Sequence, residues 1–190
     1  IRALDAERRA LLTKLLGPNW ESADYPLPSL ESITVLDGPV LGNLPPEARL
    51  ALQRIEQQSL ERVNAYLEER RAEDEPTDPA ELARLRRQTR EELAKVLTPE
   101  QLEEYLLRYS QNAVQLREQL RGFEASAEEF RTLFRALDPL DQELQLEAGP
   151  TEPEAVARRE ALEQQRETLL RESLGRERYE DYQLSQNPLY

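Results

Sequence analysis

The chain has 190 residues, a formal net charge of −13 and 33% charged residues, and it contains no cysteine, histidine or methionine. Without cysteine or histidine it cannot form a disulfide, a zinc finger, a thiol nucleophile or an imidazole base, so the commonest catalytic groups are excluded. Its 6 glycines and 6% aromatic residues are typical of a helical protein rather than a sandwich or barrel.

Acidic residues outnumber basic ones in every quarter of the chain. A surface of this sign repels phosphate and anionic lipid headgroups, so we expect neither nucleic acid nor a membrane surface as a partner. The stretch 122–154 is especially acidic. It is expected to be a solubilising face, and the alternative is a surface for a cationic partner or loosely held divalent ions.

Basic residues gather at one place, a ridge of arginines made of Arg84, Arg86, Arg87 and Arg90. The acids beside this ridge are Glu81, Glu91 and Glu92. Arginine and glutamate three or four residues apart on a helix form exposed ion pairs. We therefore expect a solvated, ion-paired helix face here.

Helix start signals recur along the chain, each a capping residue three positions before Glu or Gln, at Asp78, Thr98, Ser126 and Thr151. Apolar residues behind these caps follow helical spacing. A weak point is expected at Asp138-Pro139 because proline lacks a backbone N–H. The pattern predicts helices over 2–16, 46–71, 79–96, 99–109, 111–121, 127–146, 152–174 and 176–184.

Residues 18–45 differ from the rest because five prolines alternate with apolar side chains. The segment is too rich in proline for a helix and too apolar for a disordered linker. We expect an extended arm lying across the helices, with a short hairpin at Asp37-Gly38 as a further possibility.

The chain contains an internal repeat, with units near 86–121 and 163–190. Each unit reads as a helix, a tight turn after leucine, a short acidic helix with tyrosine, and Ser-Gln-Asn. The corner residues are Leu97, Thr98, Gln101, Tyr105 and Ser110 in the first unit and Leu174, Gly175, Tyr179, Tyr182 and Ser185 in the second. Two interpretations stay open: packed helix–turn–helix corners whose serine caps the next helix, or a ligand site at the tyrosine-lined turns.

The segment Leu97-Thr98-Pro99-Glu100-Gln101 resembles the Leu-Thr-x-x-Gln motif of the Spy/CpxP-like periplasmic proteins, which are all-helical chaperones and envelope-stress regulators. The longer string 97–105, followed by Leu116-Arg117-Glu118-Gln119-Leu120 and Glu129-Phe130-Arg131, resembles uncharacterised bacterial proteins with an N-terminal membrane anchor. That second resemblance spans roughly 85–190. It implies a periplasmic or other extracytoplasmic setting and no known activity.

No stretch of the sequence reaches the roughly 20 apolar residues of a membrane span, so we expect a soluble chain that does not itself insert into a membrane. Since the sequence begins at Ile1 and lacks methionine, we expect an upstream segment, either a signal peptide or a membrane anchor. A cytoplasmic setting stays open.

Together these observations predict a single all-α domain over 1–190, an irregular multi-helix bundle with the repeat and the arm. No catalytic, cofactor-binding or metal-ligating residue is assigned. The predicted function is a non-enzymatic protein-interaction module, chaperone-like or sensing envelope stress. The alternatives are a self-associating scaffold and, more remotely, an enzyme that uses only carboxylates such as Glu103 and Glu104, which we expect to be solvated.

Overall fold

The computed structural model describes residues 34–149 and 152–186. The chain divides into two units, Ile1–Val35 and Leu36–Tyr190, and the architecture below is that of the second. The described residues form seven helices and no strand, which confirms the all-α prediction. The predicted helix at 2–16 and most of the arm lie outside these residues.

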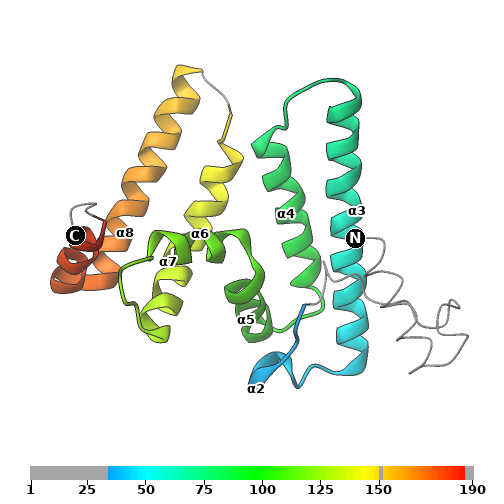
Figure 1. The fold of residues 1–190 in the computed structure, drawn as a ribbon, viewed down its shortest axis with the longest axis horizontal. Helices are drawn as coiled ribbons and strands as arrows, with labels where there is room; N and C mark the ends of the chain where they lie inside the picture. The colour runs from blue at the N-terminus through cyan, green and yellow to red at the C-terminus, as the bar shows by residue number, and fades with distance from the viewer. Residues whose placement is uncertain (1–33, 150–151, 187–190) are drawn as a thin grey trace, which may run out of the picture. The chain divides into compact units, whose positions relative to one another are not determined.

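The helices follow the predicted boundaries closely (Figure 1). They are α2 (Gly38–Leu41), α3 (Pro46–Ala72), α4 (Pro79–Leu93), α5 (Pro99–Tyr109), α6 (Gln111–Gln119), α7 (Ala127–Leu146) and α8 (Pro153–Ser185). The predicted caps Asp78, Thr98 and Ser126 each accept a backbone hydrogen bond. Thr151 lies outside the described residues.

α7 spans the predicted range with Pro139 inside it. Two details differ from the sequence prediction. The helix expected over 79–96 ends at Leu93, because a turn follows and brings Leu97 into the core with 6% exposure. The possible hairpin at Asp37-Gly38 is wrong: Gly38, with φ +78°, begins the one-turn helix α2, which places Leu41 at 0% exposure.

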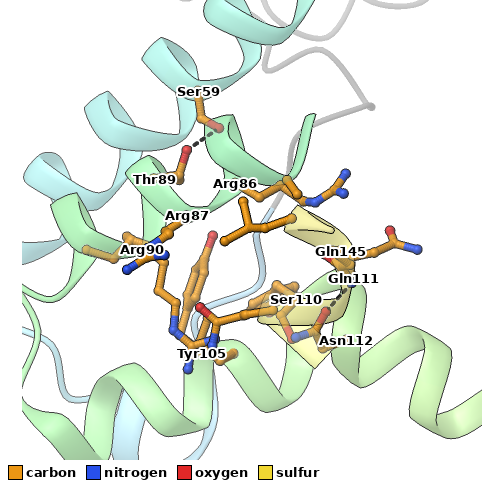
Figure 2. Close-up of a pocket in the computed structure, with 16 residues that line it drawn as sticks. Ser59, Arg86, Arg87, Thr89, Arg90, Tyr105, Ser110, Gln111, Asn112 and Gln145 are labelled. Carbon is orange, nitrogen blue, oxygen red and sulfur yellow. Dashed lines mark hydrogen bonds between the residues drawn. The ribbon is translucent and has the colours of Figure 1, made fainter. Parts of the chain in front are cut away.

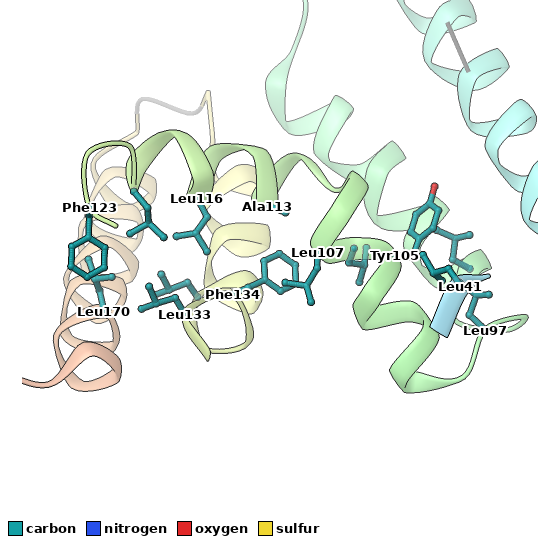
Figure 3. Packing of buried hydrophobic residues seen from close by; sticks show 14 of the residues in the cluster. Leu41, Leu97, Tyr105, Leu107, Ala113, Leu116, Phe123, Leu133, Phe134 and Leu170 are labelled. Atoms are coloured by element: carbon teal, nitrogen blue, oxygen red, sulfur yellow. The ribbon is translucent and has the colours of Figure 1, made fainter. Parts of the chain in front are cut away.

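α7 holds the described part of the chain together, since it packs against α4, α6 and α8. α3 pairs with α4, and α5 packs against α2 and α6. Figure 3 shows the shared core running from Leu41 and Leu97 at one end, past Phe134, to Leu170 and Phe123 at the other. Among the described residues, no helix is both long and apolar enough to cross a bilayer.

The first repeat corner is built by reciprocal capping and one buried tyrosine. The backbone N–H of Gln101 donates to Thr98 Oγ1 (3.3 Å), and that of Thr98 donates to Gln101 Oε1 (3.0 Å). Tyr105 is buried, and its hydroxyl donates to Glu56 Oε1 on α3 (2.7 Å). Ser110 caps α6 by accepting from the Ala113 N–H (3.1 Å). The corner therefore fixes where α5 ends and α6 begins.

The second corner is a kink within α8. Gly175 has φ +72° and ψ 171°, a conformation open almost only to glycine, and Leu174 packs against the core. Beyond the kink Tyr179 and Tyr182 are buried, and the Tyr182 ring meets Phe123 edge-on at 5.9 Å. Ser185 donates to the Tyr182 carbonyl (2.7 Å). A helix capped by Ser185 would fall on 187–190, outside the described residues.

Arginine–carboxylate pairs join helices that are distant in sequence. Glu104 on α5 is buried to 9% exposure and binds Arg108 (2.8 Å) and Arg131 of α7 (2.6 Å). Burial alone would raise the pKa of Glu104, but the two arginines outweigh it and the pKa lies below its ordinary value. The expectation of solvated Glu103 and Glu104 thus needs correction for Glu104, which two arginines hold ionised inside the fold.

Glu129 gives the fold its clearest dependence on pH. Hydrogen bonds from Arg178 and from the Ser126 backbone lower its pKa from 4.5 to about 2. A carboxyl with a depressed pKa stabilises the folded state above its unfolded pKa, and this contribution is lost as the pH falls through the folded value. We therefore expect the urea midpoint to fall between pH 4.5 and pH 2, the range set by Glu129. The Glu129→Gln variant should lose part of that dependence; an unchanged slope would contradict this assignment.

Candidate functional site

A pocket of about 230 Å³ lies between α4, the junction of α5 with α6, and α7, with Ser59 of α3 at one side (Figure 2). Its walls combine apolar side chains with arginines, amides and two tyrosines. The lining residues are Ser59, Ala83, Arg86, Arg87, Thr89, Arg90, Leu93, Tyr105, Leu106, Tyr109, Ser110, Gln111, Asn112, Gln142, Gln145 and Leu146. We call it the Arg86 pocket.

One buried carboxylate anchors the pocket walls to one another. Asp138 of α7 is 4% exposed and receives two hydrogen bonds from Arg90 of α4, at 3.0 and 2.5 Å. Asn112 of α6 donates to the same carboxylate at 2.8 Å and Gln142 at 3.2 Å. Because its two oxygens together accept four hydrogen bonds, Asp138 fixes α4, α6 and α7 in one arrangement.

Polar side chains around the pocket also hold one another. Gln145 donates to Asn112 Oδ1 (2.6 Å) and to Gln115 Oε1 (3.3 Å). On the opposite side Thr89 donates to Ser59 (2.7 Å), which ties α4 to α3. These bonds restrict the rotamers of the wall, so the pocket is formed before any ligand arrives.

Two tyrosines give the pocket its aromatic surface. The rings of Tyr105 and Tyr109 are 5.1 Å apart and inclined by 51°. Tyr105 occupies the middle of the view in Figure 2, and its hydroxyl is bound to Glu56. Tyr109 is 37% exposed. Both rings line the pocket and give it an aromatic wall.

The four arginines of the ridge differ in their partners. Arg84 binds Glu81 (2.6 Å) and Arg87 binds Glu91 (3.3 Å), both as exposed pairs within α4, as the sequence predicts. Arg90 instead reaches Asp138. Among residues 34–149 and 152–186, Arg86 has no acidic partner or hydrogen bond. The residue as a whole is exposed, although desolvation of its guanidinium by the surrounding protein lowers its pKa below the ordinary value. It lines the pocket and extends toward the side that Gln145 occupies (Figure 2).

Only part of the predicted site falls here. Tyr105 and Ser110 line the pocket, whereas Leu97, Thr98 and Gln101 build the corner at the N-terminal end of α5. The second corner, from Leu174 to Ser185, belongs to α8 and contributes nothing to this pocket.

The predicted solubilising acidic face over 122–154 is wrong at Asp138. This residue is buried and bound by Arg90. The signal that marks it is the spacing Phe130, Phe134, Asp138, which places the carboxylate on the apolar stripe of α7.

The described residues bring together no group of three or more acidic side chains that could hold a metal ion. Of the acids in the described residues, Glu104 and Asp138 are buried, and arginine binds both. Within the same residues, the pocket combines one guanidinium that has no acidic partner, that of Arg86, with an aromatic and apolar wall.

Comparison of this chain with protein-family models, with curated proteins and with solved structures finds no match.

Proposed function

We propose that this chain is a non-enzymatic binding module that takes up an acidic group of a protein partner in the Arg86 pocket. The observation that carries the proposal is the state of Arg86, whose guanidinium has no acidic partner among the described residues although 38 acidic residues are present in the chain. Arg86 is an exposed residue of the pocket wall, so its guanidinium is open to an incoming acidic group. A carboxylate would form a charge-assisted hydrogen-bonded pair with it.

The neighbouring side chains support binding rather than catalysis. A carboxylate that acts as general acid or base needs a free oxygen within reach of the substrate. The buried carboxylate nearest the pocket, Asp138, already accepts from Arg90, Asn112 and Gln142. These bonds make it a support of the pocket wall.

The exposed apolar side chains favour a discrete pocket over a broad client-binding surface. The large ones among the described residues are spread over several elements: Val35, Leu50, Leu60, Tyr109, Val114 and Leu184. A chaperone-like activity needs such groups gathered in one groove. The chaperone-like role, the stress-sensing role and the extracytoplasmic setting remain predictions from the sequence alone.

Display of random peptides, some with a free carboxyl terminus, tests this function. Peptides enriched on the full chain should carry an acidic group, and they should bind the Arg86→Gln variant at least about tenfold more weakly, since a hydrogen bond to a charged group contributes about 1.5–3 kcal/mol. Arg84→Gln is the matched control, because Arg84 lies on the same helix, pairs with Glu81 and is outside the pocket. Peptides that bind both variants as well as the unmodified chain would contradict the proposal.

Self-association is an outcome that the same preparation can reveal. If the acidic group comes from a second copy of the chain, light scattering should show dimers that Arg86→Gln disperses and Arg84→Gln does not. If the chain is monomeric and still binds the peptides, the partner that fills the pocket is a different protein.

A further inference from the structure

We infer that the group taken up by the Arg86 pocket is a carboxylate attached to an aromatic or aliphatic body about the size of one amino acid, and not a phosphate. This inference rests on the proposed function, because it names the chemistry of the acidic group. Three features of the pocket carry it: its charge balance, the form of its cation and its size.

The charge balance favours a ligand with a single negative charge. Three arginines line the pocket. Two of them are paired with acids, Arg87 with Glu91 and Arg90 with Asp138. Within the described part of the chain, Arg86 is then the one pocket arginine without a counter-charge, and one carboxylate neutralises it. A phosphate monoester brings about −1.5 to −2 charges at neutral pH and would leave an excess negative charge in a chain of net charge −13.

The cation itself suits a carboxylate. A guanidinium presents a planar fork of N–H donors that matches the two oxygens of a carboxylate. Among the described residues, the N–H donors of Arg86 make no hydrogen bond, whereas two donors of Arg90 bind the Asp138 carboxylate. Arg86 is therefore the side chain through which a carboxylate would be held in two-point contact.

The volume and lining of the pocket determine the size and polarity of the group that carries the carboxylate. A volume of about 230 Å³ lies below the range of about 300–1,000 Å³ usual for drug-sized ligands. The tilted pair Tyr105 and Tyr109, with Leu93 and Leu146, supplies the apolar surface. A terminal residue with an aromatic or aliphatic side chain meets both conditions.

Three small probes, each with one phenyl ring, test the inference on the full chain by ¹⁵N nuclear magnetic resonance. N-acetylphenylalanine carries the carboxylate, its carboxamide is the neutral analogue, and phenyl phosphate carries the larger charge. We expect N-acetylphenylalanine to shift the resonances of Arg86 and Gln145 and to bind at least about tenfold more tightly than the other two probes. The Arg86→Gln variant should lose this difference, and Arg84→Gln should keep it.

The outcomes separate a failure of the carboxylate assignment from a failure of the proposed function. Tighter binding of phenyl phosphate, dependent on Arg86, would overturn the carboxylate assignment and leave an anion-binding pocket. Equal binding of the acid and its carboxamide would overturn it as well, since the charge would then contribute nothing. If no probe shifts the pocket while selected peptides still bind through Arg86, the inference falls and the proposed function stands. If neither probes nor peptides depend on Arg86, both fall.

Discussion

The Asp138→Ala variant is expected to unfold with a free energy about 3 kcal/mol lower than that of the unmodified chain. Removing one partner of a buried ion pair costs about 3–5 kcal/mol, because the other charge is left without compensation. The lower end applies here, since the Arg90 side chain keeps 27% exposure and can turn toward water. Asn112 and Gln142 lose their acceptor at the same time. Urea denaturation followed by circular dichroism measures the change.

Two further variants decide whether the loss comes from the ion pair. Glu143→Ala removes an exposed carboxylate from the same helix and should change stability by no more than about 0.5 kcal/mol. A double variant, Arg90→Met with Asp138→Leu, should recover part of the loss, because it removes the unpaired charge. Equal effects of Asp138→Ala and Glu143→Ala would show that the pair does not hold α4 to α7.

The second large effect is expected at Leu170, the fully buried leucine of α8, which belongs to the same core cluster as Leu133 and Leu137 of α7. Leu170→Ala should lower the free energy of unfolding by about 2–5 kcal/mol, because it removes buried apolar surface and leaves a cavity. The same substitution at Leu184, on the same helix but 52% exposed, should have little effect. Comparable losses at the two positions would contradict the packing of α8 against α7.

Local features of the fold could be predicted from the sequence because their causes lie within a few residues. Thr98 and Gln101, like Ser126 and Glu129, form capping boxes three residues apart. Gly175 interrupts α8 where the repeat places a turn, since its backbone adopts a positive φ. The end of α4 was missed by three residues, because the turn after Leu93 depends on burying Leu97.

The candidate site could be predicted only in part, because its geometry depends on how distant helices pack. The sequence marks Tyr105 and Ser110, which the corner itself positions. Arg90 and Asp138 are 48 residues apart, and nothing local indicates that they meet. Arg90 binds Asp138 of α7, and Arg86 lies in the wall of the pocket. The sequence therefore predicts that all four arginines of the ridge form exposed ion pairs, whereas in the structure their partners differ from one arginine to the next.

Binding by the Arg86 pocket is decided by the dissociation constant of one selected acidic peptide for three full-length proteins: the unmodified chain, Arg86→Gln and Arg84→Gln. Their free energies of unfolding should agree within about 0.5 kcal/mol, as expected for exposed substitutions, so that a change in binding is not a change in folding. We predict a constant at least about tenfold higher for Arg86→Gln and an unchanged one for Arg84→Gln. Equal constants for all three proteins would contradict a binding role for the Arg86 pocket.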